Sequence, residues 1–206
     1  MYADLMLLNI NPFITSVYRE SGVRVIGVPR DLEVDERVLR DFFIIRRVII
    51  DDIDRLREEK NYLIAFKPRD KESARRAGKV ESFSLTILID EDTIEYCTRE
   101  QIEVMRGKST SLEILARAIL DDRKAPRYLR HLGACVKYAV KNGVDIIISS
   151  GSRTSEEIFP PRSFRVVERY LIGIRGVLTY SWFHVLEKWN KNLVREIGSV
   201  KKREKT

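Results

Sequence analysis

Short β-like runs alternate with helix-like segments along almost the whole chain. The runs are apolar, rich in β-branched residues and too short for helices, as is typical of buried parallel strands. Eight such runs occur, at residues 4–8, 24–28, 47–50, 62–66, 84–89, 111–115, 144–149 and 176–180. A βα unit repeated about eight times predicts an α/β fold, a single closed TIM-like (β/α) barrel, with an open doubly wound sheet as the alternative.

The length of the chain, 206 residues, fits one such domain with a short tail. We expect the barrel to span residues 1–199. Residues 200–206 are strongly basic, and we expect this tail to be disordered because it has no means to pack.

The clearest helical pattern runs from Pro126 to Lys141. Its apolar residues recur on one face, a proline stands near the first turn, and an Asn-Gly pair supplies the stop. A second helix, over residues 161–172, follows the same pattern and would present three arginines to solvent. Shorter helices are predicted at residues 13–21, 51–60, 70–79 and 182–193, the last with two tryptophans as core anchors.

The run that begins at Val144 stops abruptly in a cluster of small residues, Ser149-Ser150-Gly151-Ser152-Arg153. Small residues at the carboxyl end of a parallel strand expose N–H groups and hydroxyls that suit phosphate. A plain strand-to-helix turn would have the same composition. The phosphate interpretation predicts contact with phosphate or an RNA backbone by Ser150, Ser152, Arg153, Arg162 and Arg165.

Two cysteines, Cys97 and Cys135, are the only ones in the chain, and no close pair could make a metal knuckle. We therefore interpret both as buried thiols in a reducing compartment, with the cytoplasm as the expected location. No apolar run approaches the length of a membrane span, and the first residues do not resemble a secretory signal, so we expect no membrane partner.

Positive charge is concentrated in the second part of the chain. Residues 1–121 hold 20 Lys and Arg against 23 Asp and Glu, whereas residues 122–206 hold 18 against 8. A one-sided basic surface attracts polyanions, and nucleic acid is the polyanion we favour over a merely solvated basic face. The acidic stretch at residues 31–59 would face away from a phosphate backbone.

Basic residues also gather in three clusters near predicted strand ends, where a polyanion would be bound. A solvated helix face would explain any single cluster, but three together favour a binding surface. The clusters are Lys67 with Arg69, Arg75 with Arg76 and Lys79, and Arg123 with Lys124, Arg127 and Arg130.

Residues for catalysis or metal binding are scarce. The chain has two histidines, His131 and His184, both on predicted helices, which argues against a His-rich metal site. The best carboxylate cluster, at residues 90–92, could hold Mg²⁺ through waters, but helix capping or a solvated loop is favoured. The serines after residue 148 have no histidine placed near them by sequence and no nucleophile-elbow motif, and no nucleotide-binding glycine motif is present.

Several segments resemble protein component 3 of archaeal and eukaryotic ribonuclease P, in the same order and spacing over nearly the whole chain. The most specific is Ile147-Ile148-Ser149-Ser150-Gly151, followed by Glu157-Ile158 and Pro161. Others are Tyr2-Ala3-Asp4-Leu5 and Leu112-Glu113-Ile114, with Ile119, Asp121 and Arg127-Tyr128 after the latter.

The resemblance implies a β/α barrel that is not itself a nuclease. Subunits of this kind assemble on a catalytic RNA that removes the 5′ leader from precursor tRNA with Mg²⁺, and they pair with protein component 2. This chain would then bind ribonuclease P RNA and component 2, in a two-plus-two heterotetramer, beside the other protein subunits. No cofactor would be bound by the polypeptide, and Mg²⁺ would act with the RNA.

Two positions depart from the family pattern. Phe159 stands where an arginine is usual before the Pro element, and Ser163 stands where an aspartate is usual after it. The contacts of those two family residues are therefore not carried over to this chain.

Two other classes of function stay open from the sequence. One is a barrel enzyme that acts on a small phosphorylated substrate at the strand ends, with Asp90 or Glu113 as acid or base. The other is a non-catalytic scaffold that binds no RNA.

Overall fold

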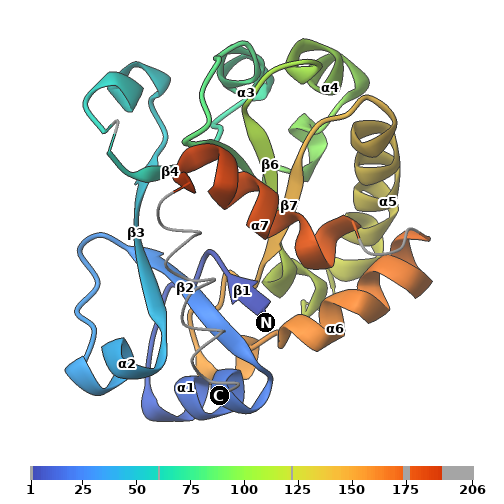
Figure 1. The fold of residues 1–206 in the computed structure, drawn as a ribbon. Helices are drawn as coiled ribbons and strands as arrows, with labels where there is room; N and C mark the ends of the chain where they lie inside the picture. Colours follow the sequence, from blue (N-terminus) through green and yellow to red (C-terminus); the bar gives the residue numbers. More distant parts are fainter. Residues whose placement is uncertain (1, 60, 122, 174–176, 192–206) are drawn as a thin grey trace.

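The computed structural model describes residues 2–59, 61–121, 123–173 and 177–191 of the chain. Within them, seven parallel strands form one sheet in sequence order (Figure 1). The strands are β1 (Tyr2–Asp4), β2 (Val23–Pro29), β3 (Phe43–Ile50), β4 (Leu63–Phe66), β5 (Leu85–Ile89), β6 (Ser111–Leu115) and β7 (Ile146–Ser149).

The sheet curves into a nearly closed barrel, because the chain just beyond β1 meets the chain just beyond β7. The Gly151 N–H donates to the Met6 carbonyl at 2.8 Å, and the Leu8 N–H donates to the Ser152 carbonyl at 2.9 Å. The predicted TIM-like barrel is thus confirmed, and the open doubly wound sheet is wrong.

Seven helices connect or follow the strands in the described part of the chain: α1 (Pro12–Glu20), α2 (Glu36–Asp41), α3 (Lys71–Gly78), α4 (Arg99–Met105), α5 (Ala125–Lys141), α6 (Pro161–Val166) and α7 (Val177–Trp189). Short 3-10 turns lie at η1 (Ile53–Arg57), η2 (Ile94–Tyr96), η3 (Ala116–Ile119) and η4 (Ser155–Glu157), and a π-helical segment, η5 (Val167–Ile172), continues α6. The predicted helix at residues 51–60 is therefore only a 3-10 turn.

Local sequence explains where two of these helices start. Asp70 accepts the Ser73 N–H at 2.7 Å, and the Ser73 hydroxyl in turn accepts the Asp70 N–H at 3.1 Å, which completes a capping box at α3. At α1, the Asn11 side chain caps Ile14 N–H, and Pro12 supplies a backbone angle suited to the first turn.

The eighth predicted strand, at residues 176–180, is wrong. The backbone of residues 177–180 forms the start of α7, which lies across the amino-terminal mouth of the barrel (Figure 1). Trp182, Val185 and Leu186 of α7 are buried against apolar residues of β1 and of the amino-terminal halves of β2, β3, β4 and β7, and against the residue that follows β1, Leu5. Their spacing of three and four residues places them on one helical face, so packing against the barrel favours the helix.

The interior of the barrel is layered. An apolar layer with α7 fills the amino-terminal end. A polar layer from β3, β5, β6 and β7 occupies the middle, and Met6, Ala65, Leu88 and Leu115 form a second apolar layer toward the carboxyl-terminal end. The barrel is therefore a packed core rather than a channel.

Cys97 and Cys135 are joined in a disulfide across a sequence separation of 38 residues. The prediction of two separate buried thiols is therefore wrong, and the reducing compartment inferred from it loses its basis. Cys97 follows η2 and Cys135 lies in the middle of α5, and only the fold brings these two segments together. No helix in the described ranges is both long and apolar enough to cross a membrane.

Candidate nucleic-acid interface

A buried ion pair occupies the polar layer of the barrel. The Arg47 guanidinium donates to both carboxylate oxygens of Glu113, at 2.6 and 2.7 Å, and both side chains have an exposed fraction of 0%. Thr86 and Ser149 donate to the same carboxylate at 2.7 Å each, and Arg47 also reaches the Leu5 carbonyl at 2.6 Å. Glu113 is thus fully bonded inside the core, which leaves no room for a substrate.

Asp90 is also buried, with an exposed fraction of 1%, and holds a turn after β5. One of its oxygens accepts the N–H groups of Asp92 and Thr93, each at 3.0 Å. The other lies 3.2 Å from the Lys67 ammonium and 3.7 Å from the Arg117 guanidinium. Burial alone would raise the pKa of Asp90, but Lys67 and the Thr93 hydrogen bond hold it below its ordinary value.

The carboxylates at residues 90–92 therefore serve the turn and the ion pairs around it, as the capping interpretation predicted. Glu91 lies 3.2 Å from Arg117, and Asp92 lies 3.6 Å from Lys67 and 3.7 Å from Lys124. Among the described residues, no three His, Cys, Asp or Glu side chains gather in a way that could hold a metal ion.

The serine cluster after β7 faces inward. Ser150 donates its backbone N–H to Asp4 at 2.9 Å, Ser152 donates its hydroxyl to the Glu157 carbonyl at 2.7 Å, and both have an exposed fraction of 0%. Gly151 between them has φ of 67°, and an added Cβ would lie 3.2 Å from Leu115 and Arg117. The plain-turn interpretation therefore describes this segment, and neither hydroxyl is placed to meet an RNA backbone.

Asp4 is the acceptor around which this turn is built. Burial raises the pKa of its carboxyl, while hydrogen bonds from Ser150 and Tyr18 oppose that shift. The Tyr18 hydroxyl donates to the second carboxylate oxygen, so α1, β1 and the turn after β7 share one buried polar centre.

Five of the predicted basic site residues are already paired with carboxylates. Lys67 pairs with Asp90 and Asp92, Arg69 pairs with Asp51 at 2.6 Å, and Arg76 pairs with Asp54 at 3.0 Å. The remaining two are Lys124, which pairs with Asp92, and Arg127, which pairs with Glu95. Their charge is partly neutralised, so they attract a phosphate less than the sequence alone indicates.

Four other predicted site residues are exposed and lie in no ion pair within the described residues. They are Arg75, Arg123, Arg130 and Arg153. Arg165 is exposed and places its guanidinium over the Tyr2 ring at 5.6 Å. Arg162 belongs to α6, but its side chain lies outside the part of the chain that the structure describes.

The exposed face of α5 is the most consistently basic surface among the described elements. Arg127, Arg130, Lys137 and Lys141 recur at helical spacing and are exposed, and the 17-residue helix contains no acidic residue. Lys137 and Lys141 were not among the predicted site residues. The signal that reveals them is the spacing of cations, without carboxylates, along one helix.

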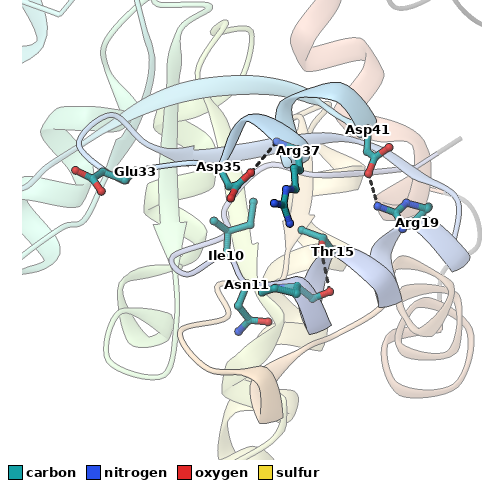
Figure 2. Close-up of a pocket in the computed structure, with 9 residues that line it drawn as sticks. Ile10, Asn11, Thr15, Arg19, Glu33, Asp35, Arg37 and Asp41 are labelled. Carbon is teal, nitrogen blue, oxygen red and sulfur yellow. Dashed lines mark hydrogen bonds and ion pairs between the residues drawn. The ribbon is translucent and has the colours of Figure 1, made fainter.

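A cavity between α1 and the segment before β3 is lined by more carboxylates than cations (Figure 2). Its volume is about 440 Å³, and three carboxylates, from Glu33, Asp35 and Asp41, line it with Arg19 and Arg37. Arg19 is paired with Asp41. This excess of carboxylates disfavours a phosphate backbone here.

The chain matches no protein-family model and no curated protein sequence. Solved structures do share its architecture. Its fold is that of a chain in archaeal ribonuclease P. That chain comes from a cryo-EM structure of the enzyme with mature tRNA, with a TM-score of 0.63, 12% identity, and coverage of 91% of this chain and 89% of that chain.

A histidinol phosphate phosphatase from Lactococcus lactis subsp. lactis Il1403, solved with zinc, L-histidinol and phosphate, is also similar. Its TM-score is 0.53 at 10% identity, covering 79% of this chain and 91% of that chain. The resemblance to ribonuclease P noted in the sequence is thus supported by the fold, which by itself is shared with a phosphatase.

Proposed function

We propose that this chain is a protein subunit of archaeal ribonuclease P, the ribonucleoprotein that removes the 5′ leader from precursor tRNA. The observation that carries the proposal is the shared fold over 91% of the chain with a chain of that enzyme. The motif resemblance supports it independently, because it rests on the residues along the same length of chain and not on their arrangement in space.

In this role the polypeptide binds and steadies the catalytic RNA and is not catalytic by itself. Its partners are ribonuclease P RNA, precursor tRNA within the holoenzyme, protein component 2 in a two-plus-two assembly, and the other protein subunits. Mg²⁺ acts with the RNA. The cytoplasmic location stays a prediction.

The basic face of α5 supports RNA as the partner. Exposed Arg and Lys side chains without nearby carboxylates are the groups that neutralise phosphates. The proposed contact surface therefore centres on Arg123, Arg130 and Arg153 with the α5 lysines, and no longer includes the buried Ser150 and Ser152.

One of the two departures from the family pattern, Phe159, has a structural role in this fold. Phe159, where the family usually has arginine, is nearly buried and stacks on Phe164 with ring centroids 5.3 Å apart. The position thus contributes to the core here.

A barrel enzyme acting on a small phosphorylated substrate is the second candidate, and the phosphatase neighbour favours it at the level of the fold. Its two candidate acid–base groups are poorly suited to catalysis. Glu113 is sealed in the barrel core, and Asp90 is buried and engaged by Lys67, Thr93 and Arg117.

Reconstitution separates the two candidates. We expect the chain, added to the cognate RNA, component 2 and the other subunits, to raise the rate of precursor-tRNA cleavage. We expect the purified chain alone to hydrolyse no phosphate ester. Cleavage that is equally fast without the chain would contradict the proposal, as would phosphatase turnover lost on the Asp90→Asn change.

A matched pair of variants tests the surface. Reversal of Arg130 and Arg153 to Glu should weaken association with the RNA, because both cations are exposed and unpaired in the described residues. Reversal of Arg40 and Arg57 to Glu makes the same charge change on other elements and should have a much smaller effect. Equal losses from the two pairs would indicate net charge rather than a defined surface.

A further inference from the structure

Two adjoining cavities lie on the outer wall of the barrel, on either side of the first turn of α4. One, of about 430 Å³, lies between α3 and α4 and is lined by Lys71, Glu72, Arg75, Thr98, Arg99, Glu100 and Gln101. The other, of about 350 Å³, lies between α4 and α5. Thr98 and Arg99 line both, so the cavities form one groove, which we name the α4 groove.

Cations predominate along the α4 groove. Lys71 and Arg75 line the first cavity, Lys137 and Lys141 line the second, and Arg99 lines both. All five are exposed, and none is ion-paired within the described residues, whereas only two carboxylates, Glu72 and Glu100, line the groove. A polyanion is therefore the ligand class that this groove attracts.

Gln101 gives a second, independent indication of a ligand. Its exposed fraction is 3%, and neither its amide nitrogen nor its amide oxygen has a hydrogen-bond partner in the structure. Gly78 on α3 leaves the room that the amide occupies, because an added Cβ would lie 2.6 Å from the Gln101 nitrogen. Both amide atoms are covered where the side chain packs against α3, so a ligand meets them only when the side chain rotates toward the groove. A buried amide without partners is unfavourable, and a ligand that supplies both a donor and an acceptor favours that rotation.

A nucleobase edge offers that pair of groups. A glutamine amide can bond simultaneously to a donor and an acceptor on one base, as it does with adenine. In duplex RNA the bases are paired and the major groove is too deep and narrow for side chains, whereas bases of a single strand can turn outward into a protein cavity. The size of each cavity is within the range of small-molecule sites.

The second cavity supplies a surface on which a base can stack. The Arg99 guanidinium lies over the Tyr138 ring at 5.7 Å, and the Tyr138 hydroxyl donates to Glu103 at 2.8 Å, which fixes the ring. Cys97 and Cys135 line the same cavity, so their disulfide ties the segment before Thr98 to α5 and holds the two walls together. Aromatic rings and guanidinium planes are the usual stacking partners of unpaired bases.

We propose that the α4 groove binds a short single-stranded segment of RNA. Gln101 rotates its amide toward the groove and bonds the edge of one base. Tyr138 and Arg99 stack against a neighbouring base, and the other four cations contact the phosphates. This inference rests on the proposed function for the identity of the polyanion, and it places the RNA on the outer wall rather than at the mouth of the barrel.

The test uses the full chain and a fluorescein-labelled, mixed-sequence single-stranded RNA of about ten nucleotides, followed by fluorescence anisotropy over a series of salt concentrations. Gln101→Leu should weaken binding by about tenfold. The same change should leave the melting temperature unchanged or raised, because it removes an unpartnered amide. A merely structural glutamine would give unchanged affinity, and that result would overturn the base contact.

The cations are tested by neutralisation. The triple change of Arg99, Lys137 and Lys141 to Gln should lower the slope of log affinity against log salt by about 0.7 for each phosphate that is no longer neutralised. A triple change of Arg40, Arg55 and Arg57 to Gln, on exposed cations outside the groove, is the matched control. Equal slopes in the two triple variants would overturn the proposal, as would tighter binding of an RNA duplex than of the single strand.

Reconstituted precursor-tRNA cleavage separates this inference from the proposed function. If the unaltered chain stimulates cleavage but its groove variants bind RNA as well as it does, the α4 groove is wrong and the function stands. If the chain binds the single strand through the groove but never stimulates cleavage, the groove stands and the function is wrong.

Discussion

Arg47 and Glu113 place a fully buried ion pair at the centre of a barrel that is otherwise apolar at both ends. Taking two charges out of water is costly, and the pair is tolerated because Thr86, Ser149 and the Leu5 carbonyl complete its hydrogen bonds. The sequence contained all of these residues, but nothing in it indicated that residues 47 and 113 would meet.

The change Glu113→Gln should lower the free energy of unfolding by about 3–5 kcal/mol, because it leaves the Arg47 charge buried without its counter-ion. Urea unfolding followed by circular dichroism measures this. Asp54→Asn, which removes the exposed pair with Arg76, is the control and should cost about 1 kcal/mol or less. A loss below that of the control would contradict the assigned role of Glu113.

Asp90 should contribute to the loss of folding stability at low pH. Because its pKa in the folded protein lies below its ordinary 3.8, its contribution is fully present above about pH 4 and is lost as pH falls through the lower, folded value. Asp90→Asn should therefore flatten the fall in melting temperature below about pH 4, and lower stability near neutral pH by about 1–3 kcal/mol. Thermal melts across pH check this, with the exposed Asp92→Asn as the variant expected to change little.

At the scale of elements, α7 shows how tertiary packing can decide between strand and helix. Residues 176–180 predict a strand because they include the β-branched Val177 and Thr179 and the aromatic Tyr180. Residues 177–180 nevertheless begin a helix whose apolar face closes the barrel. Local propensity is a weak guide where a segment can bury several large side chains by adopting the other structure.

Trp182→Ala should lower the free energy of unfolding by about 3–5 kcal/mol, since it opens a cavity where α7 meets β1, β2, β3, β4 and β7. Its sequence neighbour Phe183 is 40% exposed, so Phe183→Ala should cost about 1 kcal/mol or less. Thermal and urea unfolding of the two variants provide the comparison. Similar losses at both positions would indicate that α7 does not seal the barrel mouth.

At the scale of the whole molecule, the disulfide joins segments that are 38 residues apart and borders the α4 groove. Replacing both cysteines by alanine should lower the free energy of unfolding by about 4 kcal/mol, because the crosslink restricts the unfolded chain. Unfolding with and without reductant measures the effect. Alkylation of the denatured, unreduced protein, followed by mass spectrometry, should find no free thiol, and two alkylated cysteines would contradict the pairing.

At the same scale, the fold leaves less positive charge available to a polyanion than the sequence indicates. The sequence indicated a basic second part, and the exposed face of α5 agrees with that prediction. However, carboxylates from the first part of the chain reach Lys67, Arg69, Arg76, Lys124 and Arg127. The available positive surface is therefore narrower than the sequence predicted, and it shifts toward α5 and the α4 groove.

The sequence by itself determined strands β2 to β7, the course of α5 and the βα order that closes into a barrel, whereas the first predicted strand, at residues 4–8, shares only Asp4 with β1. These features depend on periodicity and on turn residues that lie next to one another in the chain. The tertiary structure alone decided the disulfide, the Arg47–Glu113 pair, the burial of Ser150 and Ser152, and the partners of each surface arginine. All of these join residues far apart in sequence, and long-range contacts leave no local pattern from which they could be read.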